Sequence, residues 1–118
     1  MKHANLALAL ILASPALAED PQVVAAKATL HGGAWTFDVT LAHPDTGWDH
    51  YADAWEILAP DGSRLGIRDL AHPHEAEQPF TRSLAGVIIP EGIQHVLIHP
   101  RCTVDGWAGA SYTLTLPR

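Results

Sequence analysis

Short runs of alternating hydrophobic and polar residues follow one another along the chain from residue 23 to its end. Trp35, Phe37, Val39 and Leu41 alternate with polar residues, and this period of two is typical of a β-strand with one buried face. No long segment shows the spacing of an amphipathic helix. The pattern predicts seven strands, at residues 23–30, 35–41, 52–58, 64–70, 80–89, 93–99 and 112–116.

Turn residues separate these predicted strands at intervals of about ten residues. Gly32-Gly33, Pro60-Asp61-Gly62 and Pro90-Glu91-Gly92 are typical of tight connections between neighbouring strands. Seven short strands with this spacing predict an all-β fold, specifically a seven-stranded immunoglobulin/fibronectin-III-like sandwich. An eight-stranded barrel or jelly roll would need a further strand that the pattern does not contain.

Residues 1–18 have the three parts of a signal peptide: a positive start, an apolar segment and a small-residue cleavage site ending at Ala18. The apolar run is shorter than the roughly 20 residues that a membrane span needs. We therefore expect a periplasmic or secreted protein with a single domain, residues 19–118, and no membrane span after cleavage.

The acidic charge balance argues against a nucleic-acid partner, and the sequence contains none of the common catalytic motifs. Seven Lys and Arg residues face thirteen Asp and Glu residues, for a formal net charge of −6. Because nucleic-acid binding needs a basic surface, we expect no nucleic-acid partner. The chain contains no hydrolase elbow, metalloprotease helix motif or phosphate-binding loop, so we expect no enzyme. Cys102 is the only cysteine and is most simply a small buried side chain.

Histidine is the unusual feature of the composition, with eight residues against seven Lys and Arg. Three histidines precede proline, at His43, His72 and His99, and each is predicted to close a strand because proline cannot donate to a ladder. The three strands run in the same direction in such a sandwich. Their ends should therefore meet at one pole, together with His50 and His74 from the adjoining loops.

His72-Pro73-His74 is the best local candidate for a chelating pair. In extended backbone, residues two apart point the same way, at about 6.6 Å between Cα atoms, so both imidazoles could reach one ion. His43, His50 or His99 would supply a third ligand. Imidazole donors favour copper or zinc. The leading prediction is a periplasmic metal-binding domain that acts as a carrier, buffer or sensor.

Other interpretations of the same loops stay open. The histidines could be ordinary polar loop residues, or a cluster that senses pH near 6. Asp45, Asp49 and Asp53 could supply oxygen ligands to calcium.

Three aromatic residues, Trp48, Tyr51 and Trp107, fall in predicted loops at the same pole. They either plug the end of the core or form a recognition surface. The alternative function is therefore a metal-free interaction or accessory domain that binds a protein or glycan partner at this pole.

The stretches GWDHYADAWEI, HPHEAEQPFTRSLAGVIIP and VDGWAG resemble an uncharacterised group of small exported bacterial β-sandwich proteins. The resemblance covers most of residues 48–109 and implies export and a compact β domain. A looser similarity to fibronectin type III domains rests on Trp35 in the second strand and on Gly92-Ile93-Gln94-His95 before the sixth. His95 stands where those domains have a tyrosine.

Overall fold

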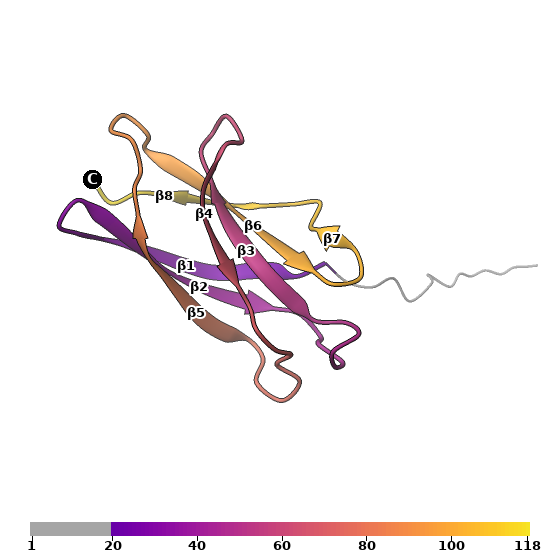
Figure 1. Cartoon of the computed structure of the whole chain (residues 1–118). Coiled ribbons are helices and arrows are strands. Elements are labelled where there is room, and N and C mark those ends of the chain that lie inside the picture. The colour runs from indigo at the N-terminus through magenta and orange to yellow at the C-terminus, as the bar shows by residue number, and fades with distance from the viewer. Residues whose placement is uncertain (1–19) are drawn as a thin grey trace, which may run out of the picture.

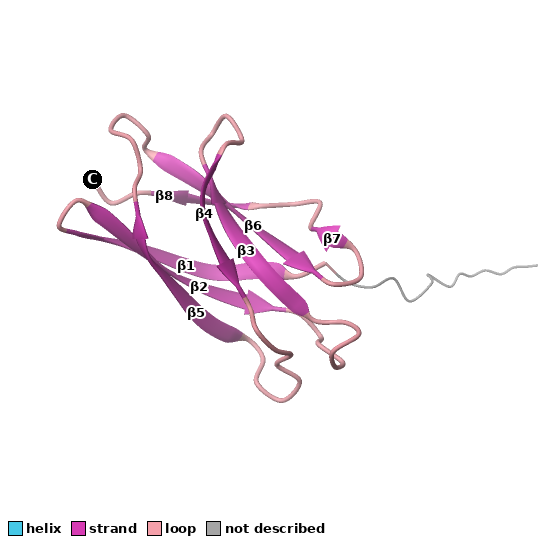
Figure 2. Cartoon of the chain, in the orientation of Figure 1, coloured by secondary structure: helices cyan, strands magenta, loops and turns pink. Residues whose placement is uncertain are grey.

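Residues 20–118 are described by the computed structural model, and they form eight β-strands and no helix (Figures 1 and 2). The predicted signal peptide and its cleavage site lie outside the described residues. Within residues 20–118, no helix has the length and apolar character needed to cross a membrane.

The strands form two antiparallel sheets that pack face to face. The smaller sheet has the order β1-β2-β5 and contains β1 (Gln22–His31), β2 (Ala34–Ala42) and β5 (Phe80–Val87). The larger sheet has the order β4-β3-β6-β7, with β8 also paired to β6. Its strands are β3 (Ala52–Leu58), β4 (Arg64–Asp69), β6 (His95–Cys102), β7 (Gly106–Trp107) and β8 (Tyr112–Thr115). The prediction of an all-β sandwich is confirmed.

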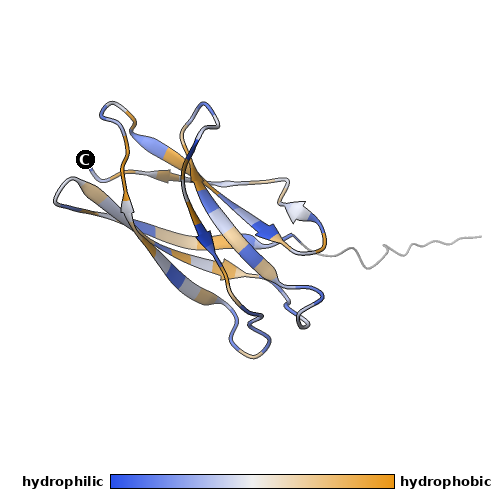
Figure 3. Cartoon of the chain, in the orientation of Figure 1, coloured by the Kyte–Doolittle hydropathy of each residue, from blue (hydrophilic) through white to orange (hydrophobic). Residues whose placement is uncertain are grey.

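The core lies between the two sheets and follows the predicted alternation. Trp35, Phe37, Val39 and Leu41 of β2 are all buried, while the residues between them are partly exposed. Trp55, Ile57, Val96 and Ile98 belong to the same buried cluster, and hydrophobic and hydrophilic segments alternate along the strands (Figure 3). Each fully buried side chain of this kind contributes about 1.5–3 kcal/mol to stability.

The course of β6 differs from the prediction that His99-Pro100 closes a strand. β6 continues to Cys102, and Pro100 pairs with Trp55 of β3. The Pro100 carbonyl accepts a hydrogen bond from the Ala108 backbone N–H at 2.9 Å. Because the nitrogen and carbonyl of a strand residue point to the same side, the missing donor of Pro100 faces the segment after β7 and not β3. The short strand β7 was also not predicted.

Three connections meet at one end of the sandwich (Figure 1). They are residues 43–51 between β2 and β3, residues 70–79 between β4 and β5, and residues 103–105 between β6 and β7. We call these three connections the loop pole. The predicted convergence of these loops is confirmed, and β2 does end directly before His43.

Candidate metal centre

Three side chains with metal-binding chemistry come together at the loop pole: His43, His50 and Cys102. One donor atom from each lies within 4.8 Å of the other two. His43 follows β2, whereas Cys102 ends β6 in the opposite sheet and pairs with Ala52 at the start of β3. The cluster therefore lies where the two layers of the sandwich meet.

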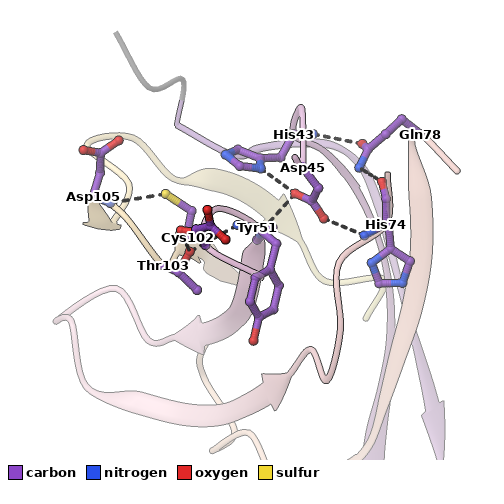
Figure 4. A network of polar contacts seen from close by, with 10 residues as sticks. His43, Asp45, Tyr51, His74, Gln78, Cys102, Thr103 and Asp105 are labelled. Carbon is purple, nitrogen blue, oxygen red and sulfur yellow. Dashed lines mark hydrogen bonds and ion pairs between the residues drawn. The ribbon is translucent and has the colours of Figure 1, made fainter. Parts of the chain in front are cut away.

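Asp45 holds the His43 ring in one orientation. Its Oδ1 accepts hydrogen bonds from His43 Nδ1 at 2.6 Å and from the Ala52 backbone N–H at 3.0 Å, and its Oδ2 accepts one from the His74 backbone N–H at 2.8 Å (Figure 4). Both side chains of the His43–Asp45 pair are fully buried. Because Nδ1 donates to the carboxylate, the His43 lone pair is on Nε2, as in a metal-ligating histidine backed by a carboxylate.

The Nε2 atoms of His43 and His50 are both buried and have no hydrogen-bond partner among the described residues. Leaving a buried polar atom unpaired costs about 1–3 kcal/mol, and a bound ligand can remove that cost. The Cys102 side chain is buried, and its Sγ accepts a hydrogen bond from the Asp105 backbone N–H at 3.4 Å (Figure 4). Two imidazole nitrogens and one thiol thus form a donor set suited to a transition metal.

A tight turn brings His50 against His43. The His50 backbone N–H donates to the Gly47 carbonyl at 3.1 Å, and the Thr46 N–H donates to the His50 carbonyl at 3.0 Å. Gly47 has a φ of 141°, which a residue with a side chain rarely adopts. The turn places the two imidazole rings 4.8 Å apart in an edge-to-face arrangement.

His72 and His74, the predicted chelating pair, lie next to each other but outside this cluster. Their ring centroids are 4.6 Å apart. His74 Nε2 accepts a hydrogen bond from Arg82 Nη2 at 2.7 Å, and its ring stacks on Phe80 at 3.8 Å. The structure brings no third ligand to this pair within the described residues.

The environment of His74 disfavours its charged form. Burial is the largest cause that lowers its pKa below the ordinary value of 6.5, and the positive charge of Arg82 and the neighbouring His72 lower it further. Asp45 and Glu77 oppose these effects only in part. The neutral imidazole is the form that can accept the hydrogen bond from Arg82.

A pH dependence of stability follows from the lowered pKa of His74. Below about pH 6.5 the unfolded chain binds a proton at this residue more readily than the folded protein does. We therefore expect the free energy of unfolding, measured in urea, to fall as the pH drops from 6.5 toward the lower folded-state pKa. In His74→Gln the slope over this interval should become shallower. An equal slope in the wild type and in His74→Gln would contradict the assignment.

His99 is not placed to bind a metal. It lies within β6, where Nδ1 is 2.9 Å from Glu56 Oε2 and Nε2 is 2.7 Å from the Ala108 carbonyl oxygen. Its ring stacks against Trp107 at 5.2 Å. Because both ring nitrogens are engaged within the protein and His99 is not part of the cluster, the prediction of His99 as a ligand is corrected.

The loop aspartates do not converge on a calcium site either. The two carboxylate oxygens of Asp45 accept three hydrogen bonds. Asp53 forms an ion pair with Arg101, with contacts of 3.0 and 2.8 Å. The only group of three or more potential ligands within residues 20–118 is His43, His50 and Cys102. The structure therefore does not bring the three loop aspartates together, as the calcium interpretation requires.

Cys102 is the member of the cluster that the sequence interpretation left out of the ligand set. Val96, Ile98, Pro100 and Cys102 alternate along β6 on its buried face. A cysteine in this register at a strand end points toward the interior of the pole where the histidines were expected. That signal could have identified it.

Comparison with known proteins finds a relative that matches part of this chain. A protein of Halomicrobium mukohataei described as "Putative lipoprotein" is 42% identical over 78 residues, which are 66% of this chain and 38% of that protein. The chain thus spans well under half the length of this relative. No family model matches the chain, and no solved structure matches it.

Proposed function

We propose that this protein is an exported carrier, buffer or sensor for a transition metal, copper or zinc, bound by His43 Nε2, His50 Nε2 and Cys102 Sγ. One observation carries the proposal: two buried imidazole nitrogens without partners lie beside a buried thiol. The similarity to a protein described as a "Putative lipoprotein" supports an exported protein associated with the cell envelope.

The donor set favours copper or zinc over hard cations. Thiolate and imidazole are the donors that both metals accept, whereas calcium and magnesium take oxygen ligands. Asp45 would orient His43 and raise its basicity, which is the usual role of a carboxylate behind a ligating histidine. We propose that Asp45 positions His43 and does not itself bind the metal, because its two oxygens already accept three hydrogen bonds.

Metal titration of the whole protein tests the proposal. We expect the purified protein to retain copper or zinc by elemental analysis, and the metal-free protein to bind one equivalent of Cu²⁺, Zn²⁺ or Co²⁺. The cobalt form should show a sulfur-to-metal charge-transfer band. Cys102→Ser should abolish this band and weaken affinity at least about 100-fold, more than losing a hydrogen-bond partner of a ligand typically costs.

A matched control for this titration is His31→Ala, which changes the exposed last residue of β1 at the other end of the sandwich. It should bind metal as the wild type does. The proposal would be wrong if the protein bound no stoichiometric metal, or if Cys102→Ser bound it with unchanged affinity and an unchanged spectrum.

The second candidate function is a metal-free interaction domain that holds a protein or glycan partner at the loop pole. The exposure of Trp48, at 67% of its surface, favours it. Partner binding by Cys102→Ser equal to that of the wild type, in a protein that retains no metal when purified, would favour this function over the first.

A further inference from the structure

Exposed apolar side chains lie on the loop pole, in the segments that carry His50 and Cys102 of the candidate metal centre. Trp48 is 67% exposed and Val104 is 53% exposed, and the half-buried Tyr51 ring packs edge to face against Trp48 at 5.6 Å. We call Trp48, Tyr51 and Val104 the apolar cap. The expectation that aromatic residues plug the end of the core is wrong for Trp48, whose ring faces solvent.

The apolar cap is fixed to the site by the chain itself and by hydrogen bonds. The Thr103 backbone N–H donates to the Tyr51 carbonyl at 3.0 Å, and the Tyr51 N–H donates to Thr103 Oγ1 at 3.1 Å. Thr103 Oγ1 in turn donates to the Asp49 carbonyl at 3.2 Å. Tyr51 directly follows His50, and Thr103 directly follows Cys102, so a molecule seated on the cap would contact the segments that carry two of the proposed ligands.

The Asp and Glu side chains of the loop pole give the loops around the apolar cap a negative charge. The loop pole contains five acidic residues and no Lys or Arg. Asp49 and Asp105 are exposed and directly follow Trp48 and Val104. Arg101 and Arg82, in the strands next to these loops, are engaged in ion pairs: Arg101 pairs with Asp53, and Arg82 lies beside Glu77 at 3.6 Å.

We infer that the apolar cap docks a protein whose contact surface has an apolar centre ringed by Lys and Arg, and that this partner delivers or accepts the metal. The second part rests on the proposed function. Exposed tryptophan is a typical energetic centre of an interface, and an acidic rim steers a basic partner and fixes its orientation. A second copy of this chain would bring two acidic rims together, so like charge disfavours self-association through this surface.

The chain offers a matched control for the apolar cap. Ile88 is 64% exposed in the connection between β5 and β6, at the opposite end of the sandwich from the loop pole. Ile88→Ala removes a comparably exposed apolar side chain away from the acidic loops.

The test uses a defined probe, a synthetic peptide with a central leucine and phenylalanine segment flanked by lysines, and a counterpart with glutamates in place of the lysines. We expect the lysine peptide to shift the backbone amide resonances of residues 47–51 and 102–106 in the metal-loaded protein. The glutamate peptide should leave them unchanged. Trp48→Ala should weaken binding about ten-fold, and Ile88→Ala should leave it unchanged. In Asp49→Asn/Asp105→Asn the affinity should become less sensitive to salt.

The results separate this inference from the proposed function. Peptide shifts spread over the whole surface, or equal binding by the wild type and Trp48→Ala, would overturn the docking surface even if metal binds. If the protein binds no metal but still binds the peptide at the apolar cap, the docking surface is supported. The same result would overturn the metal-binding function and, with it, the inference that the docked protein delivers or accepts metal. Because Trp48 is exposed, its variant should fold, which an unchanged circular dichroism spectrum would verify.

Discussion

His50→Ala is expected to lose at least about 100-fold in affinity for copper or zinc, while His72→Ala/His74→Ala keeps the affinity of the wild type. The Nε2 of His50 is buried and has no hydrogen-bond partner among the described residues, and a donor atom of His50 lies within 4.8 Å of donor atoms of His43 and Cys102. Removing it leaves two protein donors, and the loss should exceed the roughly 10- to 100-fold cost of removing a hydrogen-bond partner of a ligand. Competitive titration against a chelator of known affinity measures both constants.

The double variant is the matched control for His50→Ala, because it also removes imidazole from the loop pole. His72 and His74 lie together but outside the cluster, with His74 Nε2 engaged by Arg82. The reverse result, with His50→Ala unchanged and the double variant impaired, would reject the ligand set of His43, His50 and Cys102 and would favour the chelate predicted from sequence.

Asp45→Ala is expected to lower the free energy of unfolding by about 3–5 kcal/mol, because three buried donors lose their shared acceptor. The substitution leaves the buried His43 Nδ1 and the backbone N–H groups of Ala52 and His74 without their acceptor. Each unpaired buried donor costs about 1–3 kcal/mol. Urea unfolding of the metal-free protein measures the loss without a contribution from bound metal.

Asp49→Ala provides the comparison for Asp45→Ala, since it removes a carboxylate from the same loop at an exposed position. Its effect should stay within about 0.5 kcal/mol, as for most surface substitutions. Similar losses in the two variants would mean that Asp45 does not hold the loops together. Asp45→Ala should also weaken metal binding about 10- to 100-fold, because the His43 ring loses the group that orients it.

The role of Asp45 links the candidate site to the fold. One carboxylate connects the loop after β2, the start of β3 and the loop before β5. The Gln78 side chain adds a second connection, since its Oε1 accepts from the His43 backbone N–H at 3.0 Å and its Nε2 donates to the His74 carbonyl at 2.9 Å. The same contacts that close the pole therefore preorganise the donor atoms, and a metal bound there would stabilise the folded state further.

The sequence by itself determined seven of the eight strands and the end of the sandwich at which His43 and His50 meet. Alternation such as Trp35, Phe37, Val39 and Leu41 is a local property, because successive strand residues point to opposite faces. Turn signals are equally local, and together they predicted the sandwich and its loop pole. The prediction that β6 ends at His99-Pro100 was wrong because the rule that proline ends strands uses only local sequence. The hydrogen bond that the Pro100 carbonyl accepts from the Ala108 backbone N–H depends on the tertiary structure.

Only the tertiary structure decided which donors form the candidate site. His43 and His99 share the same local His-Pro pattern, yet Asp45 leaves one nitrogen of His43 free whereas Glu56 and Ala108 engage both nitrogens of His99. Cys102 joins the cluster because β6 pairs with β3 across a long stretch of sequence and brings it opposite Ala52. A ligand set depends on which lone pairs remain unused after folding, and these depend on contacts between distant segments that periodicity does not encode.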